Sequence, residues 1–452
     1  MPKELFGTDG IRGVPGEFPL DNATLEAAGG ALAAYLAAAS GPEASGRPRI
    51  LLGMDTRESS GHLAARLARG AMDAGAEVAS AGIISTPGVA CLVRENKFSA
   101  GVVVSASHNP YTDNGVKLIS AQGTKMPDAA EAVLEKDILR RRERASAASD
   151  ANLPADVVLD EQYLEYLRRF VLPGARLEGM PLVLDCANGA VSELGPELFR
   201  SLGARVTALH NRPNGRNIND GCGSLHPESL RKAVIETGAS LGAAFDGDAD
   251  RAIFVSSSGR IMDGDAVMFI AARHMKAAGT LRGGVVVGTT MSNLGLERAL
   301  EAEGIGLARA NVGDRYVFEE MQRRGANLGG EQSGHVIFLD YSITGDGLLT
   351  ALIMASLVAM EGPLDELAAD LKVYPQRIVN VRVRAKPPLE SLGEVSRTLA
   401  MAGTTLGAKG RVVLRYSGTE PVARVMVEAE RDEDVERWTR ELATALKGAI
   451  GA

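Results

Sequence analysis

Three carboxylates at alternate positions form the strongest chemical signal in the sequence. Asp246, Asp248 and Asp250 lie in the segment DGDADR, directly after a short apolar run. Like charges this close repel one another unless a cation holds them, and carboxylate oxygens are preferred ligands of Mg²⁺ and Ca²⁺. An EF-hand is excluded, because it would need Gly and Glu at the positions of Arg251 and Ser257. The segment therefore predicts a site for one hard divalent cation.

A serine at the end of another apolar run is a candidate nucleophile. Ser107 lies in SASHNP, just after the predicted strand 100–104, and His108 follows it. Ligands bind at the carboxyl ends of strands in open α/β sheets, although an ordinary capped turn would use the same residues. Lys117 lies ten residues beyond Ser107 and could point to the same site. If phosphorylated, Ser107 would add one more anionic ligand to the three carboxylates.

Two further polar loops carry groups that could bind a phosphorylated sugar. The segment GGEQSGH places Glu331, Ser333 and His335 on one loop, which offers an acceptor, a hydroxyl and a titratable ring to sugar hydroxyls. The segment RYSGTEP combines a guanidinium, two hydroxyls and glycine-exposed backbone, which together can cradle a phosphate. Its candidate binding residues, with one arginine beyond the segment, are Arg415, Ser417, Gly418, Thr419 and Arg424. The alternative for each loop is a plain turn between two strands.

Short apolar strands alternate with helical periods along most of the chain, and these elements must position the four loops. Such strands are typical of α/β sheets whose strands are buried on both faces. After Pro375 the pattern changes to three alternating strands and a closing helix. We therefore expect three similar α/β domains with mixed sheets, followed by a smaller α+β C-terminal domain. The expected boundaries are 1–152, 153–256, 257–373 and 374–452.

Composition sets the cellular context. The chain has 452 residues, which suggests about three domains, with four also compatible. A net charge of −8 argues against a nucleic-acid binder. The scattered cysteines Cys91, Cys186 and Cys222 argue against a disulfide framework and a zinc site. The N-terminus lacks an apolar signal core, and the apolar stretch 27–39 is too short to span a membrane. We expect a cytoplasmic protein without a membrane partner.

The four loops together resemble one superfamily. SASHNP, DGDADR, GEQSGH and RYSGTEP, in this order, are similar to the motifs of the α-D-phosphohexomutases, and the resemblance covers essentially the whole chain. Within that superfamily the chain is most similar to the phosphoglucosamine mutase family. The segments that carry this finer resemblance are FGTDGIRG (6–13), NIN (217–219), CGS (222–224), VGDRYV (312–317) and the loop with Gln332.

The resemblance implies a mechanism as well as a fold. It implies that Ser107 carries a phosphoryl group, that glucosamine 6-phosphate becomes a 1,6-bisphosphate, and that the reoriented intermediate leaves as glucosamine 1-phosphate. This reaction would feed UDP-N-acetylglucosamine synthesis, with the bisphosphate as primer. One Mg²⁺ per chain would be held by Ser107 and the three aspartates. Arg12 and Arg251 are placed near the reacting phosphate by motif match. Lys117, His108 and His335 all remain candidate proton shuttles.

The resemblance also implies a division of labour around the phosphosugar. Glu331 and Ser333 would bind the sugar, and the loop from Arg415 to Thr419 would bind the phosphate that is not reacting. Reorientation would need the C-terminal domain to hinge near Tyr374-Pro375. The alternatives are a phosphomannomutase or phosphoglucomutase of the same superfamily, and a non-catalytic sugar-phosphate sensor. The sequence leaves a homodimer open.

Overall fold

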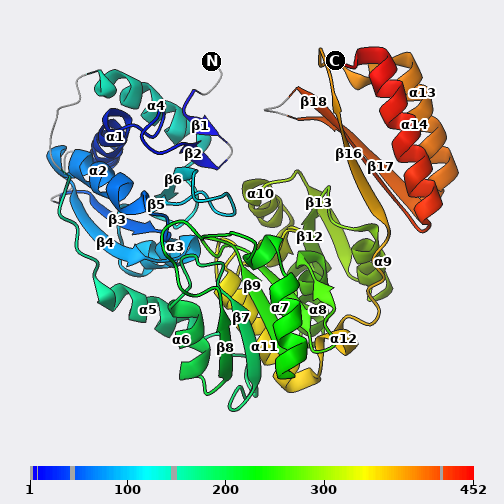
Figure 1. Cartoon of the computed structure of the whole chain (residues 1–452), viewed down its shortest axis with the longest axis horizontal. Coiled ribbons are helices and arrows are strands. Elements are labelled where there is room, and N and C mark those ends of the chain that lie inside the picture. The colour runs from blue at the N-terminus through cyan, green and yellow to red at the C-terminus, as the bar shows by residue number, and fades with distance from the viewer. Residues whose placement is uncertain (1–3, 8, 41–45, 144–149, 418–420) are drawn as a thin grey trace.

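The computed structural model describes residues 4–7, 9–40, 46–143, 150–417 and 421–452. Within these residues the chain folds into four β-sheets, each with helices from the same stretch of sequence. Figure 1 shows the four parts in chain order, from the blue first domain to the orange and red C-terminal domain. The expectation of three α/β domains with mixed sheets and a smaller C-terminal domain is confirmed.

Each domain is built from helices and strands that follow one another in the chain. The first domain comprises β1 (Phe6–Gly7), β2 (Gly10–Gly13), α1 (Asn22–Ser40), β3 (Arg49–Met54), α2 (Ser60–Asp73), β4 (Glu77–Ile83), α3 (Thr86–Glu95), β5 (Ala100–Val104), β6 (Asn114–Ser120) and α4 (Asp128–Arg142). The second comprises α5 (Val157–Arg168), β7 (Pro181–Asp185), α6 (Leu194–Ser201), β8 (Arg205–Leu209), α7 (Glu228–Thr237), β9 (Leu241–Phe245), β10 (Ala252–Ser256) and β11 (Ile261–Met262). The third comprises α8 (Gly264–Ala277), β12 (Val285–Thr289), α9 (Leu294–Ala302), β13 (Gly306–Ala310), α10 (Asp314–Arg324), β14 (Leu328–Gly330), β15 (Val336–Phe338), α11 (Gly347–Glu361) and α12 (Leu364–Leu367). The C-terminal domain comprises β16 (Gln376–Arg382), α13 (Gly393–Leu406), β17 (Gly410–Tyr416), β18 (Val422–Ala429) and α14 (Asp432–Ile450).

The first three sheets repeat one strand order. Each has three parallel strands followed by an antiparallel fourth strand, so that neighbours run β4-β3-β5-β6, β8-β7-β9-β10 and β13-β12-β14-β15. The connections from the third to the fourth strand of the three sheets are residues 105–113, 246–251 and 331–335. Three of the four loops that carry chemistry therefore occupy the same position in the three repeats.

Burial explains why these strands read as apolar runs. Every residue of β5 and of β9 is buried. Polar side chains cap some of the helices: Ser85 accepts a hydrogen bond from the Gly88 N–H at the start of α3, and Asp346 accepts one from the Leu349 N–H at the start of α11. The polar loops begin where the apolar strands end. The alternation of apolar and polar segments in the sequence therefore indicates both the buried core and the candidate site.

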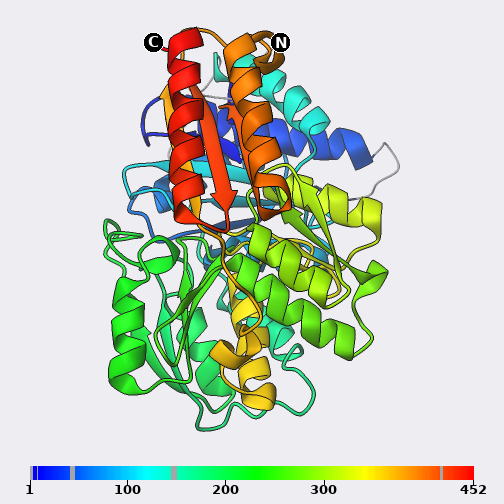
Figure 2. The same cartoon turned by 90° about the vertical axis from the view of Figure 1, so that its right-hand side faces the viewer.

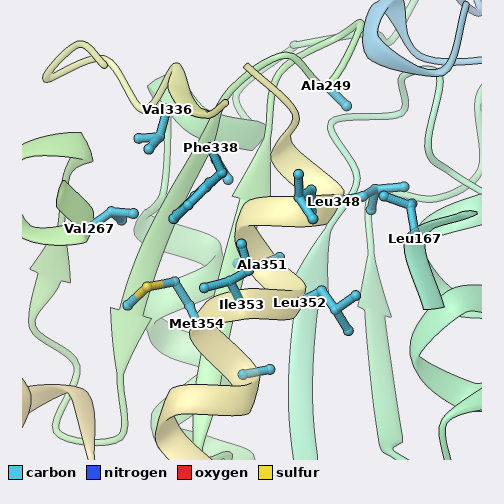
Figure 3. Close-up of a cluster of buried hydrophobic side chains, with 14 of the residues drawn as sticks. Leu167, Ala249, Val267, Val336, Phe338, Leu348, Ala351, Leu352, Ile353 and Met354 are labelled. Atoms are coloured by element: carbon cyan, nitrogen blue, oxygen red, sulfur yellow. The ribbon is translucent and has the colours of Figure 1, made fainter. Parts of the chain in front are cut away.

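The second and third domains share a core around α11. Figure 3 shows its side chains Leu348, Ala351, Leu352, Ile353 and Met354 between residues from both domains. Every residue of this helix from Gly347 to Leu357 is buried, which accounts for its continuous apolar sequence. Among the described helices, none has the length and apolar character needed to cross a bilayer.

The C-terminal domain has a sheet with one covered face. Its antiparallel strands are ordered β16-β18-β17, and α13 and α14 cover one side (Figure 2). Alternate residues of β18, such as Val425 and Val427, pack into the core around Trp438. Arg424 therefore lies on the opposite face, together with its cross-strand neighbour Arg415. This open face is directed toward the other domains (Figure 1).

Polar contacts join this domain to the third. Glu428, fully buried, pairs with Arg411 at 2.6 Å and accepts a hydrogen bond from the Leu294 N–H at 2.8 Å. Asn293 holds the connecting segment, since its side chain accepts from the Tyr374 N–H at 2.9 Å and donates to the Tyr374 carbonyl at 3.0 Å. The predicted hinge at Tyr374-Pro375 thus lies in a short connection that is anchored on its third-domain side.

Candidate active site

The predicted nucleophile lies at the junction of the first and second domains. Ser107 follows β5, has a backbone φ of 52° and is 1% exposed. A non-glycine residue in this left-handed region is strained, and such strain concentrates at functional turns. The hydroxyl donates to Asp246 Oδ2 at 2.6 Å and lies 3.4 Å from His108 Nδ1. The structure therefore brings the SASHNP and DGDADR loops together.

Three side chains from outside this turn donate hydrogen bonds to its backbone carbonyls. Arg57, whose ion pair with Asp55 is completely buried, donates to the Ser107 carbonyl at 3.0 Å and the Asn109 carbonyl at 2.9 Å. Asn219, from the second domain, donates to the same two carbonyls at 2.8 and 3.0 Å. Arg12 donates to the Ala106 carbonyl at 2.9 Å. Arg57 and Asn219 were not among the predicted site residues, because neither lies in a segment whose local pattern indicates a role at Ser107.

The carboxylate triad fits a hard cation. Carboxylate oxygens of Asp246, Asp248 and Asp250 lie within 4.8 Å of one another, and all three residues are buried. Burial, together with the neighbouring carboxylates Asp250 and Asp248, raises the pKa of Asp246 to about 8. Asp248 Oδ1 and Asp250 Oδ1 accept no hydrogen bond within the described residues. Buried carboxylate oxygens without a donor, in a set that contains only oxygen ligands, are suited to Mg²⁺.

Lys117 supplies a positive charge to this group. Its ammonium is 2% exposed and lies 2.7 Å from Asp248, 3.3 Å from Asp9 and 3.8 Å from Asp250. Burial alone would lower the pKa of Lys117, but the three carboxylates outweigh it and the pKa is raised. Lys117 is therefore protonated at neutral pH in this state.

The two histidines of the predicted site have different surroundings. Burial, with Arg251 and Arg12, lowers the pKa of His108, so its ring is neutral at pH 7 and can accept a proton. His335 is 3% exposed, and its Nδ1 lies 3.7 Å from Asp250. Burial lowers and Asp250 raises the pKa of His335, with a net rise. Its Nε2, however, accepts the Gly345 N–H at 3.1 Å, and this hydrogen bond requires the neutral ring.

The remaining predicted residues fall into two groups. The backbone N–H of Arg251 donates to Asp246 at 3.2 Å. One carboxylate oxygen of Glu331 accepts the Gly313 N–H at 2.6 Å, and the other lies 3.4 Å from the exposed Ser333 hydroxyl. These residues lie on the loops next to the triad. Arg415 and Arg424 lie instead on the separate C-terminal sheet. Gly418 and Thr419 lie outside the described residues.

The C-terminal loop has features that the sequence did not reveal. Arg415 and Arg424 face each other directly across the β17–β18 ladder. Like charges at such a position destabilise a sheet unless an anion offsets them. Ser417 is buried, and its carbonyl accepts a hydrogen bond from Lys386 at 2.6 Å, which brings a third cation to the same end of the sheet. This clustering of positive charge is suited to a phosphate.

A glycine allows the SASHNP and DGDADR loops to approach each other. A Cβ placed on Gly247 would lie 2.5 Å from the Ser107 carbonyl oxygen, which is far too close. We therefore expect Gly247→Ala to lower the free energy of unfolding by about 1–3 kcal/mol, as overpacking does in rigid cores. Gly448→Ala is the matched control, because nothing lies within 4 Å of its Cβ in α14, and alanine should there add about 0.5–1 kcal/mol. Urea unfolding of both variants tests this, and equal effects would contradict the close approach.

Sequence comparisons agree with this architecture. Profiles of the phosphoglucomutase/phosphomannomutase family match α/β/α domain I at residues 3–145, domain II at 161–259, domain III at 263–374 and the C-terminal domain at 378–445. A crystal structure of a family protein from Burkholderia thailandensis superimposes with a TM-score of 0.81 at 25% identity and covers 99% of both chains. Fold and site thus define a four-domain phosphohexomutase.

Full-length relatives narrow the assignment. The chain is 52% identical to the phosphoglucosamine mutase of Solibacter usitatus, with 100% of both chains covered, and 50% identical to that of Koribacter versatilis, with 99% and 98% covered. An N-acetylphosphoglucosamine mutase from Aspergillus fumigatus, solved with GlcNAc-6P and magnesium, shares the fold at 18% identity and a TM-score of 0.63, covering 100% of this chain and 97% of that one. The chain belongs to the phosphoglucosamine mutase family.

Proposed function

We propose that this chain interconverts glucosamine 6-phosphate and glucosamine 1-phosphate through a phosphorylated Ser107 and a glucosamine 1,6-bisphosphate intermediate. The observation that carries the proposal is the buried Ser107 hydroxyl, bonded to Asp246 at 2.6 Å beside two further carboxylates. Full-length similarity to phosphoglucosamine mutases supports this choice of substrate.

The reaction consists of two phosphoryl transfers in opposite directions. In the first, the C1 hydroxyl oxygen of glucosamine 6-phosphate attacks phosphoserine phosphorus, a new P–O bond forms, and the bond to Ser107 Oγ breaks. The 1,6-bisphosphate then reverses its orientation, and Ser107 Oγ takes the phosphoryl group from C6. The enzyme ends phosphorylated, as it began, and the proton lost at C1 is balanced by the proton gained at C6.

Asp246, Asp248 and Asp250, with Ser107, would hold one Mg²⁺, which when bound neutralises charge on the transferring phosphoryl group. The protein's own groups do the remaining work. Arg57 and Asn219 fix the turn that presents Ser107 Oγ, because they bind its backbone carbonyls from two different domains. Positioning of this kind can supply a large part of the rate enhancement in phosphoryl transfer.

We assign roles to these groups from their surroundings. His108 is neutral and lies next to Ser107 Oγ, so it can accept a proton. Lys117 is buried among carboxylates that raise its pKa, so it keeps its proton, and we give it the role of stabilising negative charge beside the triad. A group that exchanges protons works best with a pKa near the working pH, which favours His108 over Lys117 as the proton shuttle. His335 lies beside Asp250 and is closed off from solvent, so we give it a positioning role.

The decisive experiment compares substrates. Purified protein should convert glucosamine 6-phosphate far faster than mannose or glucose phosphates, with added bisphosphate as primer. Mass spectrometry should find one phosphate on the peptide that contains Ser107. Faster turnover of mannose or glucose phosphates would favour the alternative mutases, and binding without turnover of any hexose phosphate would favour a sensor.

The proposal assigns the phosphate that is not reacting to the loop of Arg415. Its guanidinium can bind phosphate through charge-assisted bonds worth about 1.5–3 kcal/mol each. Arg415→Ala should therefore raise KM roughly tenfold to a hundredfold. It should also release 1,6-bisphosphate into solution during turnover, because a weakly held intermediate escapes before it reorients. Arg397→Ala is the control, since Arg397 is an exposed arginine of α13 in the same domain. An unchanged KM with no bisphosphate release would place the phosphate site elsewhere.

A further inference from the structure

A second cluster of metal-ligating side chains lies in the second domain, apart from the aspartate triad. It consists of Asp185 at the end of β7, His210 just after β8, and Cys222 in the loop before α7. Their ligand atoms lie within 4.8 Å of one another, and Asp185 Oδ2 is 3.0 Å from His210 Nδ1. Asp185 and Cys222 are buried, whereas the His210 side chain is 32% exposed. An ion from solvent could therefore enter from the His210 side.

The carboxylate of this cluster is held in place by the backbone. Asp185 Oδ1 accepts the Ala187 N–H at 3.0 Å, and Oδ2 accepts the Gly223 N–H at 3.1 Å. Hydrogen bonds of this kind orient a carboxylate ligand before the metal arrives and are a regular feature of protein metal sites.

His210 has a strained backbone and a poorly aligned contact with Asp185. Its backbone φ is 45°, in the left-handed region that non-glycine residues rarely adopt. Its Nδ1 is buried and lies 3.0 Å from Asp185 Oδ2, and this carboxylate raises the pKa of His210, but the two groups are poorly aligned for a hydrogen bond. A backbone conformation of this kind costs about 1–3 kcal/mol and persists only where the surrounding structure holds it in place, often at a functional site. A ligand bound between the two atoms would account for both features.

The chemistry of the three side chains selects the kind of ligand. A cysteine–histidine nucleophile is excluded because Cys222 is 1% exposed and burial, then Asp185, raises the pKa of its thiol to about 12. A set of one sulfur, one nitrogen and one oxygen ligand suits zinc-like ions and not magnesium. Three protein ligands leave a fourth position for water.

We propose that Asp185, His210 and Cys222 bind one divalent transition-metal ion of the zinc class. The scattered cysteines predicted no zinc site, but that prediction considered cysteine spacing alone and not ligands drawn from three loops. The ion would brace the loop that supports the catalytic turn. Asn219, three residues before Cys222, donates its N–H to the Ala187 carbonyl at 2.9 Å and its side chain to the Ser107 carbonyl at 2.8 Å.

Cobalt is the probe that tests this site. Cobalt(II) bound by a thiolate has an intense sulfur-to-metal charge-transfer band, and the aspartate triad contains no sulfur. Titrating Co²⁺ into the full chain in excess Mg²⁺ should produce this band at one equivalent, and Zn²⁺ should abolish it. Cys222→Ser should lose the band, whereas Cys91→Ser, which alters a cysteine of α3 in the first domain, should keep it.

A second variant protects the test against misfolding. His210→Asn removes the imidazole but retains a residue that tolerates the left-handed backbone. With Mg²⁺ present, Zn²⁺ should raise the thermal unfolding midpoint of the unaltered chain. The apparent Zn²⁺ affinity derived from this shift should be at least tenfold weaker for His210→Asn. Absence of the cobalt band, or a band that persists in Cys222→Ser, would overturn the proposal. So would equal Zn²⁺ stabilisation of the unaltered chain and His210→Asn.

Discussion

Replacing Ser107 with alanine is expected to abolish turnover. The variant lacks the oxygen that carries the phosphoryl group between the two positions of the sugar, and no other described hydroxyl donates to Asp246. Losses of about four orders of magnitude or more follow when a covalent enzyme loses its nucleophile. The rate should be measured with added 1,6-bisphosphate, so that lack of primer is not the cause. The Ser107 peptide should also carry no phosphate by mass spectrometry.

A control separates loss of the relay from loss of the fold. Ser99 lies just before β5, at the opposite end of that strand from Ser107, and Ser99→Ala should retain nearly full activity and a similar unfolding midpoint. Turnover near that of the unaltered chain in Ser107→Ala would refute the relay. A small residual rate would not, because bound bisphosphate could still exchange phosphoryl groups slowly.

Metal removal is expected to have the next largest effect. EDTA should silence the enzyme and Mg²⁺ should restore it, because three buried carboxylates beside a phosphoserine otherwise concentrate negative charge. Asp248→Asn preserves the shape of the side chain but removes the charge, so activity at saturating Mg²⁺ should fall by about a hundredfold or more, as for other electrostatic groups at reacting centres. Zn²⁺ should not restore activity as well as Mg²⁺ does.

The controls for this experiment are a distant aspartate and a direct metal analysis. Asp432→Asn removes one exposed carboxylate in the first turn of α14 and should leave the response to Mg²⁺ unchanged. Full activity in a preparation that elemental analysis finds free of metal would contradict a role for the triad. An unchanged Mg²⁺ dependence in Asp248→Asn would remove that residue from the ligand set.

The sequence predicts most of the fold because burial leaves a local pattern. Strands covered on both faces, such as β5 and β9, must be apolar throughout, and their ends are marked by glycine and polar residues. Short strands such as β14 and β15 were not predicted, since three residues leave almost no periodicity. The strands that precede the serine and aspartate loops were found, while β10, which follows the aspartate loop, and parts of the third sheet were not.

The predicted site was limited in the same way. Ser107 and the aspartates lie in compact motifs, so their types and spacing already indicated their chemistry. Arg57 and Asn219 act on Ser107 from 50 and 112 positions away, and their effect depends on tertiary packing that no local pattern encodes. The roles of Lys117, His108 and His335 could not be separated without the charges around each ring or ammonium. Whether His108 and Lys117 act as we propose remains a prediction.

The repeated strand order has a consequence for how such a chain can change. The proposed nucleophile, cation ligands and sugar contacts lie on the equivalent hairpin of three separate sheets, so each set is supported by strands of its own. A substitution in one hairpin should affect only the function proposed for that hairpin, because the other two hairpins belong to separate sheets whose strand pairing it does not change. We therefore expect substitutions at residues 331–335 to alter substrate preference while the proposed phosphoryl relay stays intact. The repeated strand order thus predicts that the sugar accepted by such a chain can change while the reaction itself is retained.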